Sequence, residues 1–230
     1  MRITRLGLCV LGFSFAALFC GIGFCLGEGT SKTTVLIGAR LIEFIDMMKA
    51  RSAWYIPTID LDESWYIFAE QPGWTKESFF QNALQPALRD ELSNPIYLQR
   101  TLRSPRVSIA KKAVATNKEN LKTLYDAGVK VRFGTDSGAI PIRIPGFAEH
   151  RELQLMVESG LTPLQALECA TAHAAALLRL GDRGVLEPGK FADFVVLTAN
   201  PLDDISNTEK IAAVWHREKQ VSRAVGSFLQ

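Results

Sequence analysis

The sequence predicts an α/β fold with a small antiparallel sheet beside it, and three observations support this class. Residues 111–128 have the apolar periodicity of a helix and lead at once into the apolar stretch 129–133, an order typical of parallel sheets. Two more helices are indicated, over 147–159 and from Thr162 onward. Several short β-rich runs then lie within residues 192–221.

The length and composition are those of a globular protein. The 230 residues can bury a core, and 47% hydrophobic and 22% charged residues are ordinary values. Lysine and arginine number 26 against 24 acidic residues, and no basic stripe alternates with aromatic residues, so we expect no nucleic-acid partner. Of the four cysteines only Cys169 lies in the body of the chain, which excludes a disulfide framework or a zinc site of several thiolates there.

Residues 1–29 have the pattern of a secretory signal peptide or a membrane anchor. Arg2 and Arg5 precede an uncharged apolar run from Leu6 to Gly27, with small residues near its end. The run also reaches the roughly 20 residues that cross a bilayer, so a retained anchor stays open. We therefore expect an exported protein that is periplasmic, extracellular or anchored, with membrane contact only through this segment.

The elements between this segment and residue 111 are less regular. In order, they are a strand at 33–42, a helix at 43–51, a strand at 53–59 and an irregular amphipathic helix at 75–92. Asp60, Asp62 and Glu63 follow the second strand. They predict an acidic loop, which is usually solvated, with ligand binding as the alternative.

The strongest candidate for chemistry is Asp136, which follows the predicted strand 129–133 in the sequence GTDSG. The carboxyl ends of parallel strands carry site residues because the loops that follow converge there. A carboxylate in this place can bind a metal ion or move a proton. Asp-Ser-Gly is also ordinary turn or capping chemistry, while the flanking glycines favour function because they permit close approach to a ligand.

His150, in the first turn of its predicted helix, is the second candidate, for contact with substrate or metal. A lone histidine is more often a capping or surface residue. Thr162 and the proline after it start a helix whose apolar stripe we expect in the core: Leu164, Leu167, Ala170, Ala174 and Leu178. We expect Cys169 and His173 to be structural and His216 to lie at the surface.

Three stretches resemble the C-terminal third of the metal-dependent amidohydrolase superfamily, nearest its imidazolonepropionase-like and Xaa-Pro dipeptidase-like members. They are FGTDSG, GLTPLQALECATAHAAALLRL and DRGVLEPGKFADFVVLTANPL, within residues 120–221. The resemblance implies the last βα units of a (β/α)₈ TIM-like barrel over 43–180, with AWYIPTIDL as a late barrel strand. It also implies a small β-sandwich formed from both chain ends, residues 30–42 and 181–230.

The resemblance further implies hydrolysis of C–N bonds in non-peptide amides, lactams or dipeptide-like small molecules, with a divalent metal ion, zinc being expected. The aspartate that closes the last barrel strand of the family binds metal and transfers a proton, and Asp136 holds that position. The family's His-x-His pair is absent here, since His150, His173 and His216 all follow Asp136. A catalytic metal requires imidazole and carboxylate ligands together.

The passage from Ile42 into Glu43 falls where the family runs through its first βα units. A (β/α)₈ domain takes about 250 residues, so we expect a central block to be absent and roughly half of a barrel to remain. Two functions are compatible with this. One is an exported hydrolase with a truncated chain and Asp136 as metal ligand and proton shuttle. The other is an inactive remnant that serves as a binding or structural module.

Overall fold

The structure is a computed structural model that describes residues 39–221. The predicted signal or anchor at 1–29 lies outside the described residues, as do the first part of the predicted strand 30–42 and the tail after residue 221. Within 39–221 no helix has the length and apolar character needed to cross a membrane.

Helices make up most of the first two thirds of the described chain, and short strands gather near its end. The helical elements are α2 (Ala39–Ala50), α3 (Ile59–Glu63), α4 (Ile67–Glu70), η1 (Pro72–Lys76), α5 (Ser78–Ala83), α6 (Pro86–Ser93), α7 (Pro95–Leu102), α8 (Pro105–Asp126), α9 (Phe147–Glu158), α10 (Pro163–Ala170), α11 (Ala172–Leu177) and η2 (Ile205–Glu209). The strands are β1 (Trp54–Tyr55), β2 (Lys130–Val131), β3 (Phe194–Leu197), β4 (Ile211–His216) and β5 (Lys219–Val221).

The described strands form two separate sheets. β1 and β2 pair in parallel, with Trp54 opposite Lys130 and Tyr55 opposite Val131. β3, β4 and β5 form an antiparallel sheet in the order of the sequence. The predicted α/β class and the small antiparallel sheet are therefore confirmed. The described residues contain no closed barrel, and the partial barrel and the two-ended sandwich stay predictions.

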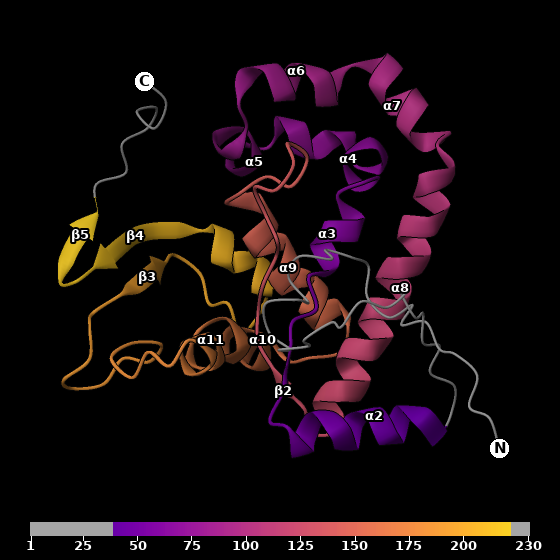
Figure 1. Ribbon diagram of the computed structural model, residues 1–230. Helices are drawn as coiled ribbons and strands as arrows, with labels where there is room; N and C mark the ends of the chain where they lie inside the picture. Colours follow the sequence, from indigo (N-terminus) through magenta and orange to yellow (C-terminus); the bar gives the residue numbers. More distant parts are fainter. Residues whose placement is uncertain (1–38, 222–230) are drawn as a thin grey trace, which may run out of the picture.

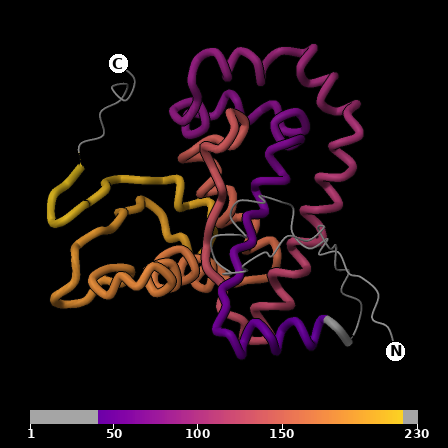
Figure 2. Tube along the Cα trace, in the orientation of Figure 1, coloured from indigo at the N-terminus to yellow at the C-terminus, as the bar shows by residue number. Residues whose placement is uncertain are grey.

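Figure 1 shows how the helices surround the short parallel pair. The long helix α8 runs along one side, α5 to α7 lie at the upper end, and the three-stranded sheet projects on the side away from α8. Figure 2 shows the chain after β1 and the chain after β2 running side by side through the middle of the molecule, as expected from parallel pairing. The segments that follow the two strands are therefore neighbours.

The main core lies where α3, α8 and α9 meet. Leu121 and Leu124 of α8, Leu155 and Met156 of α9 and Ile59 of α3 are all buried there. Each such side chain contributes about 1.5–3 kcal/mol by leaving water. This packing sets the position of α9 relative to the segments after β1 and β2.

An aromatic group extends the core toward the upper helices. The Phe80 ring on α5 packs edge to face against Phe147 on α9 at 4.5 Å between centroids, and against Phe68 on α4 at 5.4 Å. Trp74 contacts the Phe147 ring at 5.5 Å. These contacts attach the short helices α4 and α5 to the beginning of α9.

Two predicted elements near the start of the described chain are wrong in part. Residues 39–42 belong to helix α2 rather than to a strand, because Ala39, Arg40 and Leu41 are good helix formers and the β-branched run ends before them. The single helix predicted at 75–92 is divided among η1, α5 and α6. Gln85, which precedes a proline, has extended backbone and so separates α5 from α6.

The helix from Thr162 begins as predicted but does not continue as one element. Thr162 Oγ1 accepts a hydrogen bond from the Gln165 N–H, and the Gln165 side chain accepts one from the Thr162 N–H, forming a capping box. Thr171 leaves helical backbone and separates α10 from α11. Leu164 and Leu178 are 53% and 59% exposed, so the predicted apolar stripe is only partly in the core.

Replacement of Phe80 tests the aromatic group. Phe80 is 1% exposed, so we expect Phe80→Ala to lower the free energy of unfolding by about 3–5 kcal/mol, through lost burial and a residual cavity. Urea unfolding followed by circular dichroism measures this. Ile96→Ala is the control, because Ile96 is 76% exposed, and should change the free energy by no more than about 0.5 kcal/mol. Similar losses in both variants would contradict the arrangement.

Candidate functional site

Asp136 lies where the sequence predicts it, in the loop between β2 and α9 at the carboxyl end of β2. Its φ of 58° lies in the left-handed region, which aspartate tolerates better than most residues but which still costs energy. Since β1 and β2 are parallel, this loop and α3 leave the sheet at the same edge. The site is therefore built from the loop, α3 and the helix α9 that follows the loop.

The carboxylate of Asp136 is paired with Arg143, from the same loop. Arg143 Nη1 lies 3.1 Å from Asp136 Oδ2, and Arg143 is 8% exposed. The Gly138 N–H donates to the Arg143 carbonyl at 2.8 Å, which closes the loop. Burial raises the pKa of Asp62 to about 6, and the positive charge of Arg143 opposes this. Arg143 therefore acts on the carboxylates of both Asp136 and Asp62.

Glu149, in the first turn of α9, holds the loop at both ends. Its Oε1 accepts hydrogen bonds from Thr135 Oγ1 at 3.0 Å and Ser137 Oγ at 2.6 Å, and its Oε2 accepts one from the Gly146 N–H at 2.6 Å. Burial raises the pKa of Glu149, but these three hydrogen bonds outweigh burial and hold it below its ordinary value. The residues on either side of Asp136 are thus fixed to α9.

Packing and backbone conformation explain why glycine flanks Asp136 at positions 134 and 138. A Cβ on Gly134 would lie 2.7 Å from the Ile56 side chain, so only glycine allows the segments after β1 and β2 to pack this closely. Gly138 has a φ of 79°, which the tight loop requires. Packing and the tight loop therefore explain these glycines without the ligand approach that the sequence suggested.

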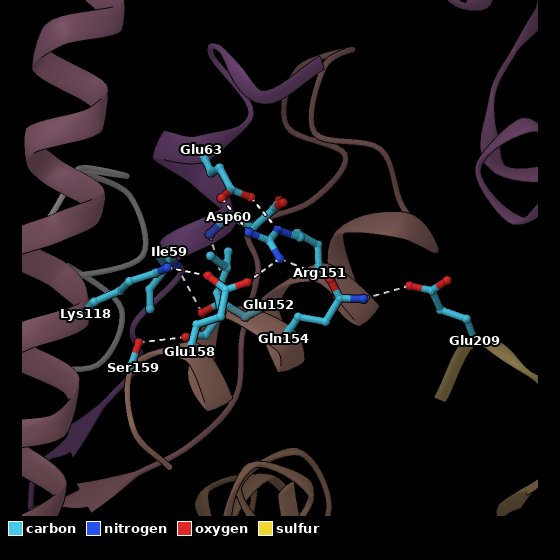
Figure 3. Close-up of polar contacts among 11 residues, drawn as sticks. Ile59, Asp60, Glu63, Lys118, Arg151, Glu152, Gln154, Glu158, Ser159 and Glu209 are labelled. Atoms are coloured by element: carbon cyan, nitrogen blue, oxygen red, sulfur yellow. Dashed lines mark hydrogen bonds and ion pairs between the residues drawn. The ribbon is translucent and has the colours of Figure 1, made fainter. Parts of the chain in front are cut away.

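A group of charged side chains, which we call the buried acid cluster, lies between α3 and α9: Asp60, Glu63, Arg151 and Glu152. Figure 3 shows Arg151 directed at Glu63, with Nε to Oε2 at 2.6 Å and Nη2 to Oε1 at 2.7 Å. Glu152 accepts the N–H groups of Ile59 at 3.0 Å and Asp60 at 2.7 Å. A single turn of α9 therefore fixes the beginning and the end of α3.

The prediction of a solvated acidic loop is wrong. Asp60, Asp62 and Glu63 lie in helix α3 and are 1%, 8% and 3% exposed. Their burial follows from partners that are distant in sequence, since Glu152 caps the start of α3 and Arg151 neutralises Glu63. The pattern of apolar and charged residues around residues 53–63 does not indicate these partners.

The buried acid cluster holds more carboxyl groups than cations. Neither carboxyl oxygen of Asp60 has a hydrogen-bond partner among the described residues. Burial raises the pKa of Asp60 well above its ordinary value, and the negative charges of Glu152 and Glu63 add to this. Burial also raises the pKa of Glu152 to about 7, against the effect of its two backbone hydrogen bonds. We infer that the cluster binds protons below neutral pH.

His150 lies between α5 and η2. Its Nδ1 is 2.9 Å from Thr208 Oγ1 of η2, and its ring packs edge to face on Phe79 at 4.8 Å. Burial lowers the pKa of His150, so the neutral ring is favoured. Neither a hydrogen bond nor an ion pair joins His150 to Asp136 in the described part of the chain, and its contact with substrate stays a prediction.

The other two histidines have separate partners. His173 Nδ1 lies 2.9 Å from the Val131 carbonyl, which attaches α11 to β2. His216 is exposed on β4, with its Nδ1 3.1 Å from Asp193 Oδ1. The structural role expected for His173 and the surface position expected for His216 agree with these contacts, and Cys169 is fully buried as expected.

The described residues do not by themselves fit the divalent metal that the resemblance implies. Over residues 39–221, no group of three or more histidine, cysteine, aspartate or glutamate side chains could hold a metal ion. The carboxylate of Asp136 instead faces the guanidinium of Arg143. Metal binding by Asp136 therefore stays a prediction that requires ligands from outside the described part.

Sequence reasoning did not single out Arg143, Glu149 or Glu152. A signal existed for Glu149, because an acid at the third position of a helix can accept the N–H of the residue that precedes the helix, here Gly146. Glu152 was detectable only as a charged residue beside Leu153 on a helix with a buried face. Arg143 had no local signal, since its role depends on how the loop folds back on Asp136.

The raised pKa values predict how stability depends on pH. The folded-state pKa values of Asp60, Asp62 and Glu152 lie above those of the unfolded chain, so the folded state binds more protons in this range. Their contribution is complete below about pH 4 and is lost as pH rises through the folded values near 6 for Asp62 and 7 for Glu152. We expect the free energy of unfolding, from urea titrations, to fall between about pH 5 and pH 8.

Glu152→Gln tests the assignment of this slope. It removes one titrating group from the buried acid cluster, and its amide oxygen can still accept a backbone hydrogen bond, so the slope should become shallower. Glu119→Gln, at an exposed position of α8, is the matched control for loss of a carboxylate. A slope that is unchanged by Glu152→Gln would show that the pH dependence arises elsewhere.

Comparisons with known proteins agree with the resemblance found in the sequence. The model of the Amidohydrolase family matches residues 26–221. An imidazolonepropionase of Deinococcus deserti is 38% identical over 104 residues, which are 44% of this chain and 26% of that protein. An ochratoxinase of Aspergillus niger is 40% identical over 95 residues, 39% of this chain and 18% of that protein.

A solved structure supports the fold. A Xaa-Pro dipeptidase with methionine bound in its active site superposes with a TM-score of 0.54 and 26% identity, over 79% of this chain and 37% of that one. The chain thus spans well under half the length of each of these relatives. Because the family model covers most of the sequence and the fold agrees, this chain belongs to the amidohydrolase family.

Proposed function

We propose that this chain forms the C-terminal part of an amidohydrolase-type enzyme that hydrolyses C–N bonds in small molecules. The observation that supports this most directly is the place of Asp136, in a half-buried loop at the carboxyl end of a parallel strand. The family includes a Xaa-Pro dipeptidase and imidazolonepropionases. By analogy, the substrate class we propose is non-peptide amides, lactams or dipeptide-like molecules.

The chemistry we propose for Asp136 is proton transfer. Hydrolysis of an amide adds water to the carbonyl carbon, breaks the C–N bond and sends a proton to the departing nitrogen. A carboxylate within reach of the water can accept its proton and deliver it to that nitrogen, leaving Asp136 unchanged at the end. Asp136 is suited to this because Glu149 holds its loop through the hydroxyl groups of Thr135 and Ser137.

The rest of the site has to come from residues outside those described here. We propose that a central block of the family fold is absent between residues 42 and 43, since the chain spans only 26% of the imidazolonepropionase and 37% of the dipeptidase. Histidine ligands would then be supplied by a longer form of the protein or by a partner chain. Export through residues 1–29 remains part of this proposal.

An activity assay tests the proposal. The longer form of the protein, or the chain together with the partner that supplies the histidine ligands, is offered N-acyl amino acids, Xaa-Pro dipeptides and lactams with zinc supplied. We expect hydrolysis of one class, and Asp136→Asn should lower kcat/KM by about 10²-fold or more because proton transfer is lost. Asp126→Asn makes the same change at an exposed position of α8 and should keep the wild-type rate. Absence of hydrolysis in all three substrate classes would contradict the proposal that the protein is a hydrolase.

Elemental analysis of the same samples tests the metal separately from turnover. A divalent ion that is retained by the wild-type chain and lost from Asp136→Asn would mean that residues beyond the described part complete a metal site. Wild type and variant with equally little bound metal would count against Asp136 as a ligand.

The proposed gap has a direct test in the genome. Sequencing of genomic DNA and transcript across codons 42 and 43 should reveal coding sequence for additional βα units, in a longer transcript or in an interrupted reading frame. An uninterrupted frame, identical in DNA and transcript, would mean that the chain is made as given and that the block is missing from the protein itself.

One observation favours the alternative, an inactive remnant that acts as a binding or structural module. The carboxylate of Asp136 is already neutralised by the largely buried Arg143, as expected for a site that no longer needs a free acid. In this case Asp136→Asn would lower stability while no substrate class is turned over.

A further inference from the structure

We propose that Glu149 is a positioning residue that presents Asp136 to the site, beyond its role in capping α9. This inference rests on the proposed function, in which Asp136 carries the proton. Within the described residues, neither a hydrogen bond nor an ion pair joins Glu149 to Asp136. It acts through the two neighbours of Asp136 in sequence, Thr135 and Ser137.

The first step is the geometry of the hydrogen bonds. One carboxylate oxygen of Glu149 accepts from the hydroxyl groups of Thr135 and Ser137, and the other accepts from the N–H of Gly146. Thr135 Oγ1 also accepts the Ser137 N–H at 3.2 Å, which closes a turn around Asp136. Both ends of the loop from residue 135 to residue 146 are therefore attached to the same side chain.

The second step is backbone conformation. Asp136 has a φ of 58°, in the left-handed region. An aspartate in an unrestrained loop would mostly adopt a negative φ instead. Conformations of this kind persist when the surrounding structure determines them from several sides. Because the Glu149 bonds act on the residue before and the residue after Asp136, they supply this restraint where it is needed.

The third step is the chemistry of the acceptor. An ionised carboxylate offers acceptor positions only, and all three donors around Glu149 are hydroxyl or N–H groups. The low pKa of Glu149 agrees with this arrangement. An amide in its place has no charge, one acceptor oxygen and one NH₂ group, which can only donate. Glu149→Gln therefore removes the charged acceptor and breaks or reverses at least one of the three bonds, while keeping the shape of the side chain.

The consequence is an energetic coupling between two residues that share no hydrogen bond or ion pair. If Glu149 sets the direction of Asp136, the ion pair of Asp136 with Arg143 at 3.1 Å depends on Glu149. If Glu149 only caps α9, the effects of changing the two residues are independent and their unfolding constants multiply. A double-mutant cycle of stability distinguishes these cases without any assay of activity.

The cycle compares Asp136→Asn in two backgrounds by urea unfolding. In the wild-type background we expect the unfolding equilibrium constant to rise about 10-fold, because the buried Arg143 loses its charged partner. In the Glu149→Gln background the same change should raise it by about 2-fold or less, a coupling of about 5-fold. If Glu149→Gln does not fold, Ser137→Ala, which removes one of the three hydrogen bonds, replaces it in the cycle.

Glu158→Gln is the matched control, since Glu158 is an acid on the same helix that pairs with Lys118 and Arg151 rather than with the loop. Its cycle with Asp136→Asn should show a coupling near 1-fold. A coupling near 1-fold for Glu149 as well would overturn the proposal and leave Glu149 as a helix cap only.

Kinetics of the same variants separate this inference from the proposed function. For an active chain, Glu149→Gln should lower kcat about 10-fold or more and leave KM within about 2-fold, because a misplaced group affects the chemical step. A rise in KM with kcat unchanged would overturn the positioning role. A chain with no activity at all defeats the proposed function, and the stability cycle then still decides the role of Glu149.

Discussion

The carboxylate of Glu152 holds the centre of this fold together. It is fully buried in α9 and accepts the N–H groups of Ile59 and Asp60, which begin α3 directly after the segment of β1. Burial of a carboxyl group without partners costs several kcal/mol, so α9 and α3 have to meet in the one register that supplies both donors. The helix α8 then packs against both and completes the core.

The same helix organises the two polar groups of the site. Glu149 and Glu152 are three residues apart and so lie on neighbouring positions of one helix face. Glu149 holds the loop of Asp136, whereas Glu152 holds the start of α3. His150, one residue beyond Glu149, faces Thr208 and joins α9 to η2 instead. One helix thus connects the loop after β2, the helix after β1 and the short helix η2 that precedes β4.

Two arginines neutralise part of the carboxylates that are gathered at this edge. Arg151 forms a bidentate pair with Glu63, and Arg143 pairs with Asp136. Pairs of this kind are hard to break when buried, because removal of one partner leaves the other uncompensated. In the described part of the chain, the charge of the Asp136 carboxylate is therefore already neutralised by Arg143. A family member that opens this site to a substrate has to supply the residues or the cation that compete with Arg143.

The sequence by itself determined the family, the α/β class, the place of Asp136 after its strand and the start of the helix at Thr162. Each depends on residues close together in the chain: a contiguous motif, an N-cap followed by proline, an apolar period. The tertiary structure alone decided that Asp60 and Glu63 are buried, that Arg143 faces Asp136 and that Glu149 holds the loop. Glu152 is 93 positions from Ile59, and a pattern within one segment contains no information about a partner that folding brings from so far away.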